Sequence, residues 1–348
     1  MQRFTLLLLY STLLLTAIGF SSVSFAKQTN DTYTLVSRDS AQIKNAVALY
    51  HKNKFKAAKT LFLQILKADQ KSLDSLVYLT RINAKQKNFD DAEGHIKIAL
   101  KLAPNNAYVQ NLSGKIYAAI AQRASIFSAL GYAKKCLKGF RTAVELSPKN
   151  IDYQQMLISY YIGAPGIAGG NEELAMQHAQ AINKLDIKQG YIAIGKVLLA
   201  QENDKALAQH LANTPTNIQN DAEVLLGKGF IYQKQKDYPQ ALVYFQRAAK
   251  NAINSDEETR TIKYQSLYQL GKTSDISKQQ LNQGIAALTQ FIDQAPSGDQ
   301  LASKEWAQFR LANLIAKQGD KSKAKSLYQL VAKNTKDENL KDKVEDLL

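Results

Sequence analysis

A short spacing of apolar residues recurs along the chain and constrains its fold more than any other feature. In "KDYPQALVYFQRAAK", Tyr238, Ala241, Phe245 and Ala248 follow one another at steps of three, four and three residues. The same or a shortened spacing recurs in Phe55, Ala58, Phe62 and Ile65; in Phe89, Ala92, Ile96 and Ala99; in Cys136, Phe140 and Ala143; and in Ala324, Tyr328 and Val331. Such steps place side chains on one side of an α-helix. The sequence therefore predicts that the same apolar helical face recurs along the chain.

A second helix, with its own signature, precedes most of these faces. Gly114 and Tyr117 are three residues apart, and the same step recurs in Gly195 and Leu198, Gly229 and Tyr232, and Ala312 and Ile315. A small residue lets two helices approach closely, and a large residue one turn later fills the space beside it. One unit departs from this pattern, because Ile158 takes the small position before Tyr161.

Two-helix units with this spacing, repeated about every 34 residues, resemble tetratricopeptide repeats. The resemblance implies an all-α, right-handed α-solenoid of about eight helix pairs over residues 39–338, with a polar-faced C-terminal capping helix at 339–348. The units begin near Asp39, Leu73, Ala107, Ile151, Lys188, Ala222, Tyr264 and Glu305.

Two adjacent units are longer than the period. About ten extra residues fall near 118–131 and about five near 163–171. The first insertion is apolar, which favours longer helices over a loose loop, and the two should touch because neighbouring repeats stack. The stretch "YYIGAPGIAGGNEELAMQHAQAI" resembles a subgroup of exported bacterial repeat proteins that carry an APGIAGG loop.

The first 26 residues have the pattern of a secretory signal peptide. Arg3 precedes an uncharged apolar run, and Ser24 and Ala26 flank Phe25, which predicts cleavage after Ala26. We then expect residues 27–38 to form a flexible lead-in and the protein to be exported to the periplasm. The alternative is an uncleaved leader that anchors the chain in the inner membrane.

The loop "GAPGIAGGNEE" raises the question of a phosphate site, because glycine-rich loops that open a helix often bind phosphate. Its residues of interest are Pro165, Gly166, Gly169, Gly170 and Asn171. No strand leads into it and no Lys-Ser or Lys-Thr follows, as a Walker loop requires. Glu172 and Glu173 would also repel a phosphate. We therefore expect a tight connection between helices, with partner binding by the loop as the alternative.

No enzyme, metal or cofactor site is indicated. The four histidines show no metal-binding spacing, and a single cysteine cannot build a thiolate site. Cys136 takes a small buried position of the repeat, so a packed side chain explains it better than a nucleophile.

The resemblance also implies that positions 2, 5, 9 and 12 of each unit face a concave groove. Position 9 reads Val47, Arg81, Lys115, Ser159, Lys196, Phe230, Lys272 and Asn313, of which half are cationic and none is acidic. Position 5 includes the amides Asn111 and Gln155. Tyr108, Phe230, Tyr268, Trp306 and Phe309 would add aromatic anchors for a peptide. The predicted partner-binding residues are Arg81, Asn111, Lys115, Gln155, Ser159, Lys196 and Phe230.

These features predict a non-enzymatic periplasmic scaffold that binds a protein or peptide with acidic groups. The net charge of +15 suits an alternative, in which an envelope-surface protein holds anionic lipid or acidic cell-wall glycan. An exported protein is not expected to bind nucleic acid.

Overall fold

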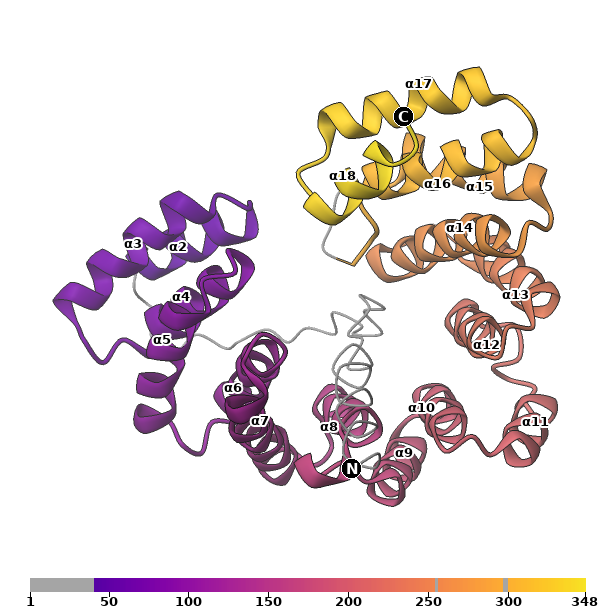
Figure 1. The fold of residues 1–348 in the computed structure, drawn as a ribbon. Helices are drawn as coiled ribbons and strands as arrows, with labels where there is room; N and C mark the ends of the chain where they lie inside the picture. Colours follow the sequence, from indigo (N-terminus) through magenta and orange to yellow (C-terminus); the bar gives the residue numbers. More distant parts are fainter. Residues whose placement is uncertain (1–40, 254–255, 297–299) are drawn as a thin grey trace, which may run out of the picture. The chain divides into compact units, whose positions relative to one another are not determined.

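The computed structural model describes residues 41–253, 256–296 and 300–348. Within these ranges the chain forms 17 α-helices and one 3-10 helix, η1, and contains no strand. The helices pack in consecutive pairs, so the predicted all-α fold of solenoid type is confirmed (Figure 1). The expected signal peptide and lead-in lie outside the described residues.

The described chain divides into two compact units, the first ending at Ala193 and the second beginning at Ile194, within α10 (Ile187–Ala200). The first unit contains α2 (Ala41–His51), α3 (Phe55–Ala68), α4 (Leu73–Lys85), α5 (Phe89–Leu102), α6 (Ala107–Ala121), α7 (Ile126–Leu146), α8 (Ile151–Gly163), η1 (Gly166–Ala168) and α9 (Glu172–Leu185). The second contains α11 (Asp204–Ala212), α12 (Ala222–Lys234), α13 (Tyr238–Asn251), α14 (Glu257–Ser277), α15 (Leu281–Gln294), α16 (Lys304–Lys317), α17 (Lys321–Asn334) and α18 (Glu338–Glu345).

The turn inside five of the helix pairs is built in the same way. Each contains one residue with positive φ: Asn53 (58°), Lys87 (61°), Glu202 (51°), Lys236 (62°) or Gly319 (99°). The amide that follows each of them donates to the carbonyl five residues earlier, as Asp237 does to Tyr232 at 2.9 Å. These bonds satisfy carbonyls that the helix end would otherwise leave unpaired. The pairs α6–α7 and α8–α9, which carry the two insertions, connect without such a residue at the end of their first helix.

The small residue of the first helix is needed for close packing, as its spacing predicts. A Cβ atom at Gly114 would lie 2.5 Å from two ring atoms of Phe140, and one at Gly229 would lie 2.5 Å from two ring atoms of Phe245. Both rings are buried. Where Ile158 takes this position, its side chain is also buried, so the departure is accommodated in the core.

Helix lengths differ between the repeats. The first insertion lies mainly in α7, which has 21 residues, whereas α6 has 15. Helix α14 also has 21 residues and starts at Glu257, before the expected unit start at Tyr264. Helix α11 has only 9 residues, although the second helices α9, α13, α15 and α17 have 14 each.

The chain ends in α18, which packs on α17. Leu340 and Val344 of α18 are fully buried in a cluster with Ala324, Tyr328 and Val331. Of the helices that the structure describes, none combines the length and the apolar character needed to cross a bilayer.

Candidate functional site

Arg81 and Lys115 lie on neighbouring first helices of the first unit. The Arg81 guanidinium lies 4.9 Å from the ring centroid of Tyr50 and 5.3 Å from that of Tyr78. Burial disfavours its charged form, but Tyr108, Tyr50 and Tyr78 outweigh burial, and the pKa of Arg81 is raised. Lys115 on α6 is exposed. Arg81 is thus a cation held among tyrosines, whereas Lys115 faces solvent.

The predicted amides of the first unit are engaged or buried. Asn111 is only 1% exposed, so it faces the packed helices. Gln155 on α8 donates from Nε2 to Oε1 of Gln189 on α10 at 2.8 Å. The Ser159 hydroxyl donates to the Gln155 carbonyl at 2.8 Å. Gln155 and Ser159 therefore bond to other groups of the fold, and Asn111 is buried, so none of the three is presented to a ligand.

Lys196 and Phe230 belong to the second unit. Burial lowers the pKa of Lys196 to about 8. Phe230 packs edge-on against the buried ring of Phe245, with 5.4 Å between ring centroids. The three cations of the predicted groove are therefore divided between the two units.

The loop at 163–171 is a tight, internally bonded connection. Gly169 has φ of +93°, and a Cβ atom at Gly170 would lie 1.8 Å from the Ala164 carbonyl oxygen, so both positions require glycine. Asn171 caps α9 by accepting from the Leu174 amide at 2.9 Å. Gly166, by contrast, has open space around it. Glu172 and Glu173 lie in the first turn of α9, where their negative charge would repel a phosphate. The loop therefore serves to start α9.

The loop at 163–171 contacts α7, the helix that begins within the first insertion. The Tyr160 hydroxyl on α8 lies 2.7 Å from the Ala168 carbonyl oxygen in η1 and 2.9 Å from the Ala133 carbonyl oxygen in α7, and can donate to either. Ile167, at the loop tip, is 77% exposed. The loop is therefore anchored to α7 while it presents one apolar side chain to solvent.

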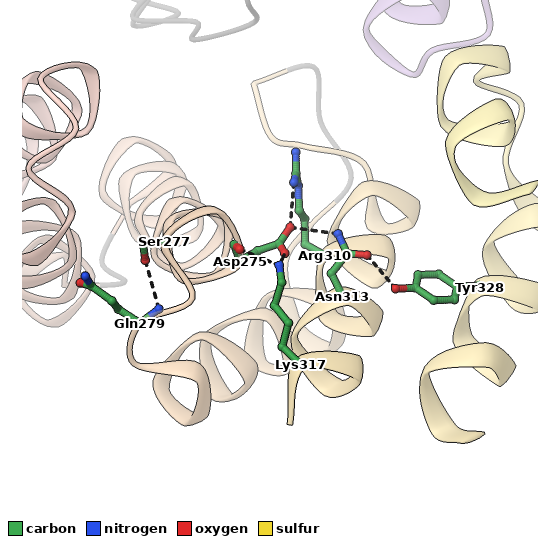
Figure 2. A network of polar contacts seen from close by, with 7 residues as sticks. All are labelled: Asp275, Ser277, Gln279, Arg310, Asn313, Lys317 and Tyr328. Atoms are coloured by element: carbon green, nitrogen blue, oxygen red, sulfur yellow. Dashed lines mark hydrogen bonds and ion pairs between the residues drawn. The ribbon is translucent and has the colours of Figure 1, made fainter. Parts of the chain in front are cut away.

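A polar cluster between α14 and α16 was not predicted (Figure 2). Its centre is Asp275, which is 3% exposed. Arg310 Nη1 donates to Asp275 Oδ2 at 2.7 Å, and Asn313 Nδ2 donates to the same oxygen at 3.0 Å. Lys317 Nζ donates to Oδ1 and, at 2.6 Å, to the backbone carbonyl of Asp275. The amide of Asn313 accepts in turn from the Tyr328 hydroxyl at 2.8 Å.

Positive charge exceeds negative charge in this cluster. Burial alone would raise the pKa of Asp275, but the bonds from Lys317, Arg310 and Asn313 lower it, so the carboxylate is charged. Lys272, one turn earlier on α14, is half-buried, and burial together with the nearby Arg310 lowers its pKa. In the described part of the chain no carboxylate lies within ion-pair distance of Lys272. Two cations thus share the carboxylate of Asp275, and a third, Lys272, lies near Arg310.

Aromatic side chains line the same region. The Arg310 guanidinium lies 5.9 Å from the ring centroid of Trp306 and 5.7 Å from that of Phe309. Trp306 is half-exposed and donates from Nε1 to Asp337 Oδ2 at 3.1 Å. Phe309 is buried, so it supports the region from beneath. We call Tyr268, Lys272, Asp275, Trp306, Arg310 and Lys317 the α14–α16 face.

Sequence reasoning named part of this face and missed its centre. Lys272 and Asn313 stand at position 9 of their units, and Tyr268 and Trp306 were expected as anchors. Asp275 stands at position 12, a groove position, and could have been named from that position alone. Arg310 and Lys317 lie outside the four groove positions, so no signal pointed to them.

Cys136 and His178 pack against other side chains of the first unit. Cys136 is fully buried, and burial raises its pKa far above the ordinary range of a thiol. His178 stacks on Tyr161 at 6.0 Å between ring centroids, and burial lowers its pKa. Among the residues that the structure describes, no three His, Cys, Asp or Glu side chains gather as a metal site would require.

Comparisons with known proteins agree with the repeat fold. The sequence model of the tetratricopeptide repeat family matches residues 223–252 and 306–334. No curated protein matches the chain. Yeast Tom70 is similar in structure, with a TM-score of 0.61, 14% identity, and coverage of 96% of this chain and 68% of Tom70. A tetratricopeptide repeat protein from Parabacteroides merdae has a TM-score of 0.51, 12% identity, and coverage of 79% of this chain and 97% of its own. At these identities the likeness shows the fold alone.

Proposed function

Because the chain is a tetratricopeptide repeat protein, we propose that it is a non-enzymatic scaffold that binds an acidic peptide segment on the α14–α16 face. The repeat fold is generally a protein-binding scaffold, because stacked repeats present an extended surface for many contacts. The observation that carries the proposal is that Arg310 and Lys317 share the carboxylate of Asp275, while the half-buried Lys272 lies near Arg310 without a carboxylate of its own.

The unbalanced charge favours an acidic partner. Asp275 neutralises part of the charge on Arg310 and Lys317, which leaves Lys272 half-buried beside a second cation. A carboxylate that approached Lys272 would offset both the burial and the repulsion that lower its pKa. The bond would be charge-assisted, and such bonds are about twice as strong as neutral ones.

The aromatic rings favour a peptide over an isolated ion. Trp306 and Tyr268 are half-exposed beside the cations, and tryptophan, tyrosine and arginine are the residues that most often dominate protein interfaces. The partner we propose is therefore a protein segment with acidic and apolar residues in alternation.

We also propose that the protein acts outside the cytoplasm, in the periplasm. The support is the signal-peptide pattern of residues 1–26. In the alternative, the overall charge of +15 would hold the protein on anionic lipid or cell-wall glycan.

The emission of Trp306, the single tryptophan of the chain, tests the proposal directly. A peptide of alternating glutamate and phenylalanine should change this emission on binding. Lys272→Glu should weaken binding at least tenfold, because the charge that meets the peptide is reversed. Lys325→Glu, on an exposed position of α17, makes the same charge change away from the face and should alter binding less than twofold.

Equal binding by both variants would contradict the proposed face. Lys115→Glu and Lys196→Glu test the groove positions predicted from sequence in the same assay. Binding to vesicles of phosphatidylglycerol tests the alternative, in which the protein is held on anionic lipid. Vesicle binding that disappears at physiological salt, with no peptide binding at all, would favour the surface-binding function.

A further inference from the structure

A cavity lies in the second unit, where α11 is shorter than the second helices α9, α13, α15 and α17. Because α11 ends at Ala212, residues 213–221 cross to α12 as an irregular segment. A cavity of about 650 Å³ lies between this segment, α11, α12 and α13. Its lining includes Gln219, Lys228, Tyr232, Gln235, Tyr244 and Arg247. This volume is in the range of small-molecule sites.

Two cations converge on this cavity around one aromatic ring. Lys228 Nζ and Arg247 Cζ each lie 5.4 Å from the ring centroid of Tyr244. Tyr232 stacks on Tyr244, with 5.3 Å between centroids and 11° between planes. Both cations therefore lie beside the ring of Tyr244, which lines the cavity with them.

Lys228 is held in place inside the fold. It is 6% exposed, and its Nζ donates to the Leu211 carbonyl at 3.1 Å. Burial, followed by the nearby charge of Arg247, lowers its pKa. Lys228 is thus fixed inside the fold, and the exposed Arg247 lies near it.

The acidic residue of the lining, Asp237, already accepts a hydrogen bond from the backbone. The Asp237 carboxylate accepts from the Gln240 amide at 3.2 Å and caps α13. The lining therefore carries two positive charges against one negative charge. An anion between Lys228 and Arg247 would relieve their repulsion.

We propose that this cavity binds a small, hydroxyl-rich organic anion, with its carboxylate or phosphate between Lys228 and Arg247. The amides of Gln219 and Gln235 lie in the lining and can bond its hydroxyl groups. The cavity is separate from the α14–α16 face, so this site does not depend on the proposed peptide-binding function.

Isothermal titration with glucuronate, glucose 6-phosphate and glucose tests the site. At least one of the two anions should bind ten or more times as tightly as glucose, which has the hydroxyls without the charge. The preferred anion distinguishes a carboxylate ligand from a phosphate ligand. If neither anion binds more tightly than glucose, the proposal is wrong.

Two variants assign the binding to this cavity. Arg247→Gln and Lys228→Met should each weaken binding of the preferred anion at least tenfold. Arg247 is exposed, so its variant keeps the test valid if the buried Lys228 variant fails to fold. Arg260→Gln, at an exposed position of α14, removes the same charge elsewhere and should change binding less than twofold. Unchanged binding in Arg247→Gln would overturn the assignment.

Discussion

Replacing Asp275 with asparagine removes the charge that joins α14 to α16 while preserving side-chain volume. The carboxylate accepts from Arg310, Asn313 and Lys317. Removing one partner of a buried ion pair costs about 3–5 kcal/mol. Because the side chains of Arg310 and Lys317 are 21% and 29% exposed, both can regain some hydration. We therefore expect Asp275→Asn to lower the free energy of unfolding by about 2–3 kcal/mol.

The effect should depend on pH with a definite sign. The folded pKa of Asp275 lies below its ordinary value of 3.8. Its stabilisation is therefore fully present above that value and is lost as the pH falls through the folded pKa. The stability difference between wild type and Asp275→Asn should be constant from neutral pH down to about 5 and should shrink below about 4.

Urea unfolding followed by Trp306 emission measures this difference, because Trp306 lies on α16 beside the cluster. Asp293→Asn, at an exposed position of α15, makes the same chemical change and should alter stability by less than about 0.5 kcal/mol. Equal stability of the Asp275 and Asp293 variants would refute the reasoning. So would a difference for Asp275→Asn that persists unchanged at pH 2.

Four further substitutions test the fold by urea unfolding. Gly229→Ala places a Cβ atom 2.5 Å from a buried ring and should cost about 1–3 kcal/mol; Gly94→Ala, with open space around it, should instead stabilise by about 0.5–1 kcal/mol. Tyr160→Phe removes the hydroxyl that bonds the loop at 163–171 and should cost about 1–3 kcal/mol, because buried carbonyls lose a donor. Leu340→Ala should cost about 2–5 kcal/mol, because this side chain of α18 is fully buried in the cluster with Ala324, Tyr328 and Val331. Equal effects of the two glycine changes would contradict the close packing, and a neutral Tyr160 or Leu340 variant would contradict the corresponding anchor.

Much of the fold could be read from local patterns. The steps of three and four residues identified the helical faces, and the small residues at Gly114 and Gly229 marked where helices approach. The phosphate alternative for the loop could be rejected because two glutamates open the next helix. The shortening of α11 was missed, because the 34-residue period is kept there while the end of the helix is replaced by an irregular segment. The lengthening of α14 was also missed.

The candidate site was only partly predictable. The groove positions named Lys272, Trp306 and Tyr268, which the structure places on one face. They also named Asn111, whose side chain is nearly fully buried, and Phe230, which packs against the core. A position in a repeat indicates a direction from the helix axis, but the packing of the neighbouring helix decides whether that direction reaches solvent.

The sequence by itself determined the helical repeats, the glycine positions and the buried faces, because each depends on residues within one or two helical turns. Only the tertiary structure decided which charges meet. Asp275 contacts residues 35 to 42 positions later, and the cavity beside Lys228 exists because α11 ends early. Both depend on how neighbouring helices stack within the second unit, and stacking distances of a few ångströms separate an ion pair from two solvated charges.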